Sequence, residues 1–456
     1  MLTPREKVAA IRGALPPEGL FADKDWLISP EPFPINASFA EELDKLGYRL
    51  QLFNRACNQL YRLSVAGKQP PWIAEYLDRG KPPELVELSR RKEFRDDLPR
   101  VIRPDLILTE SEPDRRSGYV IAELDNIPGG IGLTAWLGET YAALGHEILG
   151  GPRGMIDGFR RIAGDGDILI SQEAATYRPE MEWLAKKLRI EEPDGVRVFD
   201  AESYKSQSPI RGGGGDSRPL EDGRANPRSI YRFFEHFDLP NIPSAPAIME
   251  AVASGAVRIT PPFKPYLEEK LWFALFWLRP LREYWRRELS ERQFLKLQQV
   301  IPYTWILDPV PLPQHAVIPE LNVHDWREVM DFSQKQRELI LKISGFSEIG
   351  WGSRSVTLGS DASHTEWQAA LERALGDFPH HPWILQRFHK GRLVEQPYLD
   401  AAGAITMLRG RVRLCPYYFV SENHTRLGGA LATIAPADKK LLHGMKDAIM
   451  VPTSVG

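Results

Sequence analysis

Hydrophobic and polar residues follow two different periods along this chain, and the change falls near residue 100. Before that point, apolar residues recur at helical spacing, most regularly over 39–66, and proline pairs at 70–71 and 82–83 interrupt the pattern. The pattern therefore predicts a mostly helical N-terminal segment over residues 1–100. We find no catalytic grouping of residues in this segment.

After residue 100 the pattern becomes that of strands. Residues 101–109 and 118–125 are strand-like, and the polar stretch 110–117 between them predicts a hairpin turn. A Pro-Gly-Gly sequence at 128–130 ends the second strand, and a helix is predicted over 133–144.

The next part of the chain, 151–262, alternates short apolar strands with a helix, which predicts a small α/β unit. Its predicted elements are strands at 167–171, 196–199 and 229–234 and a helix at 180–188. Four glycines at 212–215 lack the Gly-Lys-Ser/Thr ending of a phosphate-binding loop, so we predict a flexible connection there.

The last part of the chain mixes helices and strands again. The predicted elements are helices at 266–278, 281–300 and 365–375, strands at 338–344, 383–388 and 408–420, and a Pro-rich linker at 308–319. The whole pattern predicts a mixed fold of the α+β or α/β class.

Composition narrows the class of protein. The 456 residues are enough for two or three domains, and 58 Lys and Arg against 61 Asp and Glu give a net charge of −3. This balance argues against a general nucleic-acid binder but leaves room for a local basic pocket that binds a phosphate ligand. The two cysteines, Cys57 and Cys415, exclude a disulfide framework and a cysteine-rich zinc site. The sequence has neither a signal-like start nor a membrane-length apolar stretch, which predicts a cytoplasmic protein that does not bind membranes.

The predicted hairpin carries the most informative acidic residues. With its turn centred near residue 114, Asp105 lies opposite Glu123, and Glu123 shares a face with Asp125 two residues later. Three carboxylates on one patch repel each other unless a cation neutralises them, and Mg²⁺ prefers such ligands together with phosphate oxygens. Arg103, on the same face as Asp105, suits a phosphate oxygen. The alternative is an edge hairpin whose acids are solvated.

The glycines after the hairpin also raise the hypothesis of a dinucleotide-binding turn. However, Gly130-Ile-Gly132 is followed by Ala135 where the third glycine of that fingerprint belongs. The match is therefore poor, and a tight Pro-Gly-Gly turn before a helix fits a functional hairpin better.

A second candidate site follows the strand at 338–344. Lys342 is expected to point toward a loop of small residues, whose backbone N–H groups can approach an anion closely. The loop residues that we single out are Ser344, Gly345, Gly350 and Gly352. A lysine beside such a loop suits the inner phosphates of ATP. The alternative is a mobile surface loop with a solvated lysine.

Three weaker candidates lie elsewhere in the last part of the chain. The strand at 383–388 turns polar at its end, where Gln386 and Phe388 suit an adenine edge unless this is a plain core strand. Lys270 lies on the predicted helix 266–278, where most lysines are solvated. Arg413 shares a strand face with Arg411, and the pair suits either phosphates or surface acids.

Together these residues resemble the ATP-grasp superfamily. Arg103-x-Asp105 followed by Glu123-x-Asp125-x-x-Pro-Gly is similar to the metal-binding end of the D-alanine–D-alanine ligase family. That family has Arg-x-Asp and then Glu-x-Asn-x-x-Pro-Gly, so the spacing agrees and Asp125 in the Asn position is the departure. Residues 1–100 resemble no family that we can name.

The order of the motifs resembles one branch of that superfamily. In most ATP-grasp enzymes this hairpin comes last, whereas here it precedes the lysine strand, as in the circularly permuted branch that includes glutathionylspermidine synthase. The resemblance implies a metal-binding lobe over 101–150, a pre-ATP-grasp α/β unit over 151–262 and nucleotide-clamping lobes over 263–456.

The resemblance also implies a chemistry and the residues that perform it. The activity would be ATP- and Mg²⁺-dependent joining of a small-molecule or peptide-like carboxylate to an amine through an acyl-phosphate. The implied metal ligands are Asp105, Glu123 and Asp125. The implied catalytic residues are Arg103, Lys342 and Arg413. The implied nucleotide-binding residues are Lys270, Lys342, Ser344, Gly345, Gly350, Gly352, Gln386 and Phe388.

Two other classes of function stay open at this point. One is a phosphotransferase on the same fold that acts on a hydroxyl instead of a carboxylate. The other is a nucleotide-binding module without turnover, although three clustered acids argue for an active enzyme.

Overall fold

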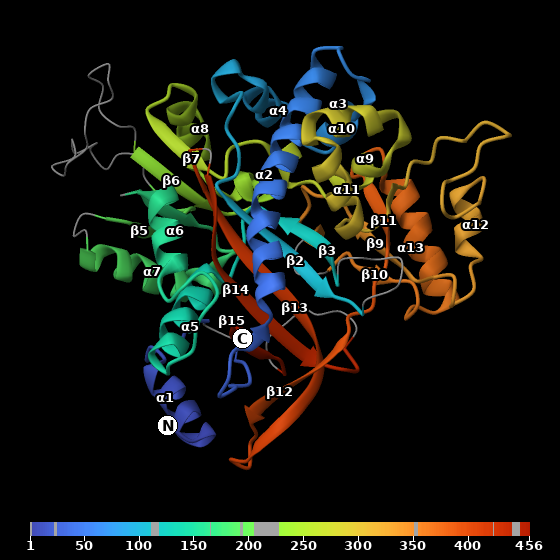
Figure 1. The fold of residues 1–456 in the computed structure, drawn as a ribbon. Coiled ribbons are helices and arrows are strands. Elements are labelled where there is room, and N and C mark those ends of the chain that lie inside the picture. The colour runs from blue at the N-terminus through green and yellow to red at the C-terminus, as the bar shows by residue number, and fades with distance from the viewer. Residues whose placement is uncertain are drawn as a thin grey trace.

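A seven-stranded sheet runs through the middle of the computed structural model (Figure 1), which describes residues 2–21, 25–110, 118–164, 166–191, 195–204, 228–350, 354–422, 424–439 and 447–456. The strand order is β1-β15-β14-β13-β2-β3, and β12 also pairs with β13. The pairings are antiparallel except between β1 and β15. The strands are β1 (Phe33–Ile35), β2 (Val101–Leu108), β3 (Tyr119–Asp125), β12 (Leu393–Leu399), β13 (Ile405–Ser421), β14 (His424–Pro436) and β15 (Ile449–Val455).

Helices cover both faces of this sheet, and two consecutive residues of β13 make the contacts. The side chain of Tyr418 packs against Gly47 of α2 (Ala37–Val65), and its hydroxyl donates to the carbonyl of Leu43 at 2.6 Å. Phe419 points the other way and packs against Gly158 of α6 (Gly154–Ala163), where an added Cβ would lie 2.2 Å from the ring. Successive strand residues alternate faces, so the sheet is the central layer of three.

A second, parallel sheet forms the α/β unit that the sequence predicts. Its strand order is β5-β4-β6-β7, and the pairings between neighbouring strands are parallel. These strands are β4 (Asp167–Ile170), β5 (Arg197–Asp200), β6 (Arg228–Phe233) and β7 (Val257–Thr260). The helices that contact its strands are α6, α7 (Arg178–Glu191) and α8 (Ala245–Ala253), whereas α5 (Ile131–Ala143) lies between α7 and the strands β14 and β15 of the central sheet. The predicted strands of this unit are confirmed, and β7 adds a fourth.

A third sheet, antiparallel and with the order β10-β9-β11-β8, has a hydrophobic core of its own. Trp305, Trp367 and Trp383 are buried in that core. Its elements are β8 (Thr304–Ile306), β9 (Leu339–Ile343), β10 (Thr357–Leu358), β11 (Trp383–Arg387), α12 (Trp326–Met330) and α13 (His364–Asp377). The two predicted strands and the predicted helix of this region are confirmed.

The remaining helices correct two predictions. They are α1 (Pro4–Ala14), α3 (Trp72–Asp78), α4 (Pro83–Arg90), α9 (Leu271–Trp277), α10 (Arg282–Leu289) and α11 (Glu291–Val300). Of these, α3 and α10 contact α2, whereas α1 contacts α5. The single helix predicted over 281–300 is two helices, because Ser290 takes a φ of +65° that breaks the hydrogen-bond ladder. The helix predicted over 266–278 begins only at Leu271, after a 3₁₀ turn over Pro265–Glu268.

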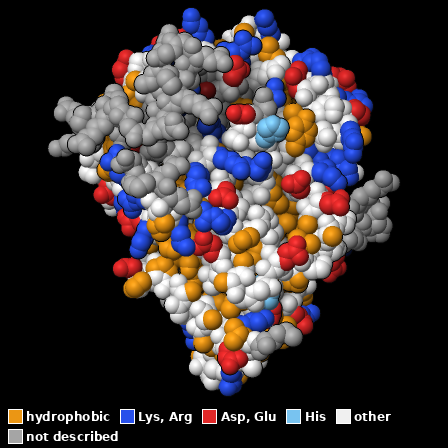
Figure 2. All heavy atoms as spheres, turned by 60° about the vertical axis from the view of Figure 1, so that its left-hand side comes forward, with side chains coloured by type: hydrophobic (Ala, Val, Ile, Leu, Met, Phe, Trp, Pro, Cys, Tyr) orange, Lys and Arg blue, Asp and Glu red, His pale blue; other side chains and the backbone are white. Residues whose placement is uncertain are grey.

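Some predicted features lie outside the described residues. These are most of the turn at 110–117, the glycines at 212–215 and Gly352. Charged residues of both signs are interspersed on the face that Figure 2 shows, in keeping with the small net charge of the chain. Among the helices that the structure describes, none has the length and apolar character needed to cross a membrane. The observed architecture confirms a mixed α+β fold.

Candidate active site

The β2–β3 hairpin has the register that the sequence predicts. Asp105 pairs with Glu123 and Arg103 pairs with Asp125, and the register shifts only beyond Asp105. The four charged side chains therefore project from one face at one end of the hairpin. Beyond the shift, Leu106 and its neighbours on both strands belong to the hydrophobic core. The hairpin thus places a charged group directly beside a packed core.

Two arginines neutralise Asp105. Nε of Arg103 lies 3.0 Å from one oxygen of Asp105, and Arg413 from β13 lies 3.3 Å from the other. Burial alone would raise the pKa of Asp105, but Arg103 and Arg413 lower it below its usual value. Cys415, two residues after Arg413 on the same strand, donates its thiol to Asp105 at 3.3 Å. Burial and the charge of Asp105 raise the pKa of this thiol to about 12, so the cysteine is an inert hydrogen-bond donor.

Arg103 also connects Asp105 to Asp125. Its terminal nitrogen lies 2.9 Å from Asp125, and another donates to the carbonyl of Gly129 at 3.1 Å. The pKa of Asp125 is raised by burial, and the negative charge of Glu123 raises it further, against the opposing effect of Arg103. Burial and the charge of Glu123 together disfavour the ionised form of Asp125 more than Arg103 favours it.

Two lysines from other parts of the chain face Glu123. Lys270 lies 2.9 Å from Glu123. Lys342, from β9, donates to the carbonyl of Ala122 at 3.0 Å and to Gln386 of β11 at 3.3 Å. Both lysines lower the pKa of Glu123, although burial opposes them. The sequence predicts Lys270 within a helix, but in the structure this residue directly precedes α9.

The two lysines differ in how well they are compensated. The pKa of Lys270 is raised by Glu123 despite burial, whereas burial and the charge of Lys270 lower the pKa of Lys342. Glu123 is the carboxylate with the largest effect on both ammonium groups. Nε of Arg413 is also buried and has no hydrogen-bond partner in the described part of the chain. An anionic group placed here would satisfy donors that the protein leaves short of acceptors.

Ser344 and Gly345 connect β9 to the segment that precedes α9. The carbonyl of Ser344 accepts from Lys270 N at 2.9 Å, and its hydroxyl accepts from Leu271 N at 2.9 Å and donates to Glu269. Glu269 in turn forms a fully buried ion pair with Lys81 at 2.5 Å. This segment holds Lys270 and Lys342 in a fixed relation to each other.

The other predicted loop and adenine-side residues that the structure describes are Gly350, Gln386 and Phe388. Gly350 ends a short 3₁₀ turn over Glu348–Gly350, and Phe388 is half-buried just after β11. Gln386 is buried, and its amide donates to Thr304 at 3.1 Å. Glu123, Lys270 and Gln386 line a cavity of about 20 Å³, which has room for about one water molecule.

Glu180 is a site residue that the sequence analysis missed. Its two oxygens accept from Gly130 N and Leu133 N, each at 2.7 Å, at the N-terminus of α5. This carboxylate caps the helix that follows the hairpin, and the hydroxyl of Tyr417 fixes the same turn by donating to Gly129 at 2.7 Å. Burial raises the pKa of Glu180 to about 7, although the two backbone donors oppose it. A carboxylate facing a Pro-Gly-Gly helix start is a tertiary contact that has no local signal.

A second acidic group missed from the sequence lies beyond Asp125. Burial and the nearby charge of Glu268 raise the pKa of Glu235 to about 8. Glu268 is itself held by Arg232 and by His236, whose Nδ1 lies 2.7 Å away. Glu235 also interacts electrostatically with Asp125 and Lys270. The candidate site therefore extends from the hairpin toward the end of β6.

Comparisons with known proteins concern the fold of the whole chain. No protein-family model and no curated protein matches the chain. Among solved structures, the chain is similar to a glutathione synthetase-like effector from Globodera pallida in its apo form. The TM-score is 0.55 at 9% sequence identity, and the match covers 100% of this chain and 98% of that chain. The chain therefore shares its overall fold with that glutathione synthetase-like protein.

The donor set of the hairpin can be compared with what Mg²⁺ requires. No group of three or more His, Cys, Asp or Glu side chains in the described residues is already arranged to hold a metal ion. Mg²⁺ commonly takes one or two carboxylates together with phosphate oxygens and water. Glu123 and Asp125 fit that requirement, because these two carboxylates lie two residues apart on the same face of β3. Asp105 is engaged by two arginines, and its role as a third ligand stays a prediction.

Proposed function

We propose that this chain is an ATP- and Mg²⁺-dependent ligase that joins a carboxylate to an amine through an acyl-phosphate. One observation carries the proposal: two segments from the last part of the chain bring Lys270 and Lys342 to the hairpin that carries the three carboxylates and Arg103. The structural similarity to a glutathione synthetase-like protein supports this assignment, because the hairpin motif independently resembles the metal-binding motif of ATP-grasp enzymes. A cytoplasmic location, where ATP is available, belongs to the same proposal.

The roles of the residues follow from their charges. Lys270 and Lys342 would contact the inner phosphates of ATP, whose negative charge compensates the two ammonium groups that share Glu123. Arg103 and Arg413 would face the γ-phosphate, held in place by Asp105 between them. Glu123 and Asp125 would hold Mg²⁺. When bound, the ion supplies charge neutralisation for the transferring phosphoryl group.

The proposed reaction has two steps. The substrate carboxylate attacks the γ-phosphorus and forms an acyl-phosphate, and ADP leaves. An amine then attacks the acyl carbon, inorganic phosphate leaves, and the amine proton passes to a base or to water. Water must be excluded between the steps because it would hydrolyse the acyl-phosphate. We assign this exclusion to the segment that begins at Ser344, together with the adenine-side residues Gln386 and Phe388.

The order of the segments supports the circularly permuted arrangement. The hairpin comes first, the parallel α/β unit follows it, and the segments with Lys270 and Lys342 come last. We therefore propose a metal-binding lobe over 101–150, a pre-ATP-grasp unit over 151–262 and nucleotide-clamping lobes over 263–456. The substrates are a small or peptide-like carboxylate and an amine.

A trapping assay tests the proposed reaction without knowledge of the natural amine. Hydroxylamine replaces the amine, and a panel of carboxylates is screened for ADP release together with hydroxamate formation. Arg413→Gln should abolish both signals, and Arg327→Gln, whose side chain is 78% exposed, should change neither. Phosphate that stays on a hydroxyl substrate would instead identify a phosphotransferase. ATP turnover that no carboxylate stimulates would contradict the ligase assignment.

A further inference from the structure

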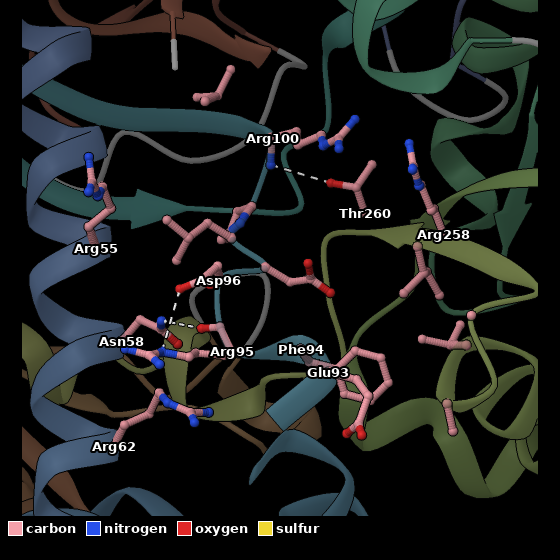
Figure 3. Close-up of a pocket in the computed structure, with 18 of the residues that line it drawn as sticks. Arg55, Asn58, Arg62, Glu93, Phe94, Arg95, Asp96, Arg100, Arg258 and Thr260 are labelled. Carbon is pink, nitrogen blue, oxygen red and sulfur yellow. Dashed lines mark hydrogen bonds and ion pairs between the residues drawn. The ribbon is translucent and has the colours of Figure 1, made fainter. Parts of the chain in front are cut away.

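A large cleft lies away from the candidate active site. It has a volume of about 1180 Å³ and lies between α2 and β7, with the segment that precedes β2 between them (Figure 3). Arg100, at the edge of this cleft, directly precedes β2, and Asp105 lies five residues further along that strand. At the rise of an extended strand this separation is about 17 Å, so the cleft is distinct from the carboxylate cluster.

Arginines line both walls of the cleft. Arg55 and Arg62 are two helical turns apart on α2, and Arg100 and Arg258 extend toward each other from the other side (Figure 3). Burial lowers the pKa of Arg100, and the charge of Arg258 lowers it further, while Asp97 opposes both. Within the part of the chain that the structure describes, none of these four guanidinium groups forms a side-chain hydrogen bond or an ion pair.

The cleft is more basic than the protein as a whole. Its described lining includes six basic and four acidic side chains, a net charge of +2, whereas the whole chain has −3. Like charges that face each other without close partners are unfavourable unless an anion binds between them. Guanidinium groups bind phosphate with paired, charge-assisted hydrogen bonds. Arginines on opposite walls therefore suit a ligand with more than one anionic group.

The walls of the cleft are fixed before any ligand binds. Lys264 is buried beneath it and donates to Asn58 of α2 at 2.9 Å and to the carbonyl of Asp97 at 2.7 Å. The side chain of Asn58 donates in turn to the carbonyl of Arg95 at 2.9 Å. Arg100 N donates to Thr260 of β7 at 3.3 Å. These bonds tie the segment between the walls to both of them, which reduces the entropy lost on binding.

The rest of the lining restricts the class of ligand. Phe94 is the only aromatic residue among the described residues that line the cleft, so it offers little for stacking the bases of a single strand. Glu93, Asp96 and Asp97 flank the basic groups and oppose a long polyanion. We propose that this cleft binds a soluble small molecule with two or more phosphate groups.

Calorimetry with inositol hexakisphosphate, a compact polyphosphate without a base, tests this proposal on the full chain. The wild type should bind, and binding should weaken as salt is raised. Arg100→Ala/Arg258→Ala and Arg55→Ala/Arg62→Ala should each weaken binding at least tenfold. Unfolding midpoints of the double variants confirm that they are folded.

Matched variants locate the binding and separate the alternatives. Arg5→Ala/Arg12→Ala removes the same charge from exposed positions of α1 and should leave binding unchanged, as should Lys342→Ala. The proposal is overturned if the wild type does not bind, or if either of these variants weakens binding as much as Arg100→Ala/Arg258→Ala. It is also overturned if citrate displaces inositol hexakisphosphate as strongly as pyrophosphate does. The same holds if a single-stranded oligonucleotide binds through the same arginines more tightly than inositol hexakisphosphate.

Discussion

Lys342 and Gln386 lie on neighbouring antiparallel strands, and Nζ of the lysine is 3.3 Å from Oε1 of the glutamine. The same ammonium group donates to the carbonyl of Ala122 in β3 at 3.0 Å. One side chain thus connects the β8–β11 sheet to the hairpin of the central sheet. This contact brings the predicted nucleotide strand to the predicted metal-binding hairpin.

Removal of the Lys342 charge should weaken nucleotide binding. Lys342→Met keeps the length of the side chain but loses the ammonium group, so we expect MgATP affinity to fall at least tenfold. Lys335→Met, at an exposed position just before β9, is the matched control and should bind as the wild type does. Calorimetric titration with MgATP measures both. Equal affinity for the two variants would remove Lys342 from the proposed site.

Asp105 should contribute strongly to stability because it lies between two arginines. Asp105→Asn leaves the partly buried Arg103 and Arg413 without their shared negative charge, so we expect a loss of about 3 kcal/mol in the free energy of unfolding. Urea denaturation measures this loss. Glu41→Gln, at a side chain that is 72% exposed, should cost less than about 0.5 kcal/mol. A cost for Asp105→Asn as small as that of the control would contradict the buried network.

Glu180 should make stability depend on pH. Its folded-state pKa of about 7 is above the unfolded value, so the folded state holds the proton more tightly. The wild type therefore loses stability relative to Glu180→Gln as the pH rises from 4.5 to 7, by about 3 kcal/mol in total. Urea denaturation of both proteins at pH 5 and pH 8 measures this difference. A difference between the two proteins that does not change with pH would show that the carboxylate is ionised throughout.

The turn at Gly130 should tolerate no side chain. Gly130 has a φ of +85°, and an added Cβ would lie 2.6 Å from the hydroxyl oxygen of Tyr417. Gly151 has a similar φ of +80° and open space around it, so Gly151→Ala reports the backbone strain alone. We expect Gly130→Ala to cost about 1–2 kcal/mol more, because it also disturbs the Tyr417–Gly129 hydrogen bond. Equal urea midpoints for the two variants would contradict this contact.

Local signals in the sequence account for much of the hairpin. The polar stretch between two strand-like segments fixes the turn, and the turn fixes the pairing of Asp105 with Glu123. The grouping of acids and Arg103 follows from that register and the two-residue period of strands. Lys342 and Gln386 were also predicted for the nucleotide side, and the structure places them in contact.

Tertiary contacts account for what the sequence did not predict. The strand β14 is buried without interruption from Gly428 to Ala435 and shows no alternation of apolar and polar residues, so the two-residue pattern of strands does not identify it. Glu180 caps a helix that begins about fifty residues earlier, and Arg413 reaches Asp105 only because β13 pairs with β2. The basic cleft also joins α2, the segment before β2, and β7, which are far apart in the chain.

The central claim is that the hairpin and the two lysines form a site for ATP with Mg²⁺. Calorimetric titration of ATP with and without Mg²⁺, on the wild type and on Glu123→Ala, tests it most directly. The proposed function predicts Mg²⁺-dependent binding to the wild type that is weakened at least tenfold, or lost, in Glu123→Ala. A wild type that binds no ATP under any metal condition would contradict it.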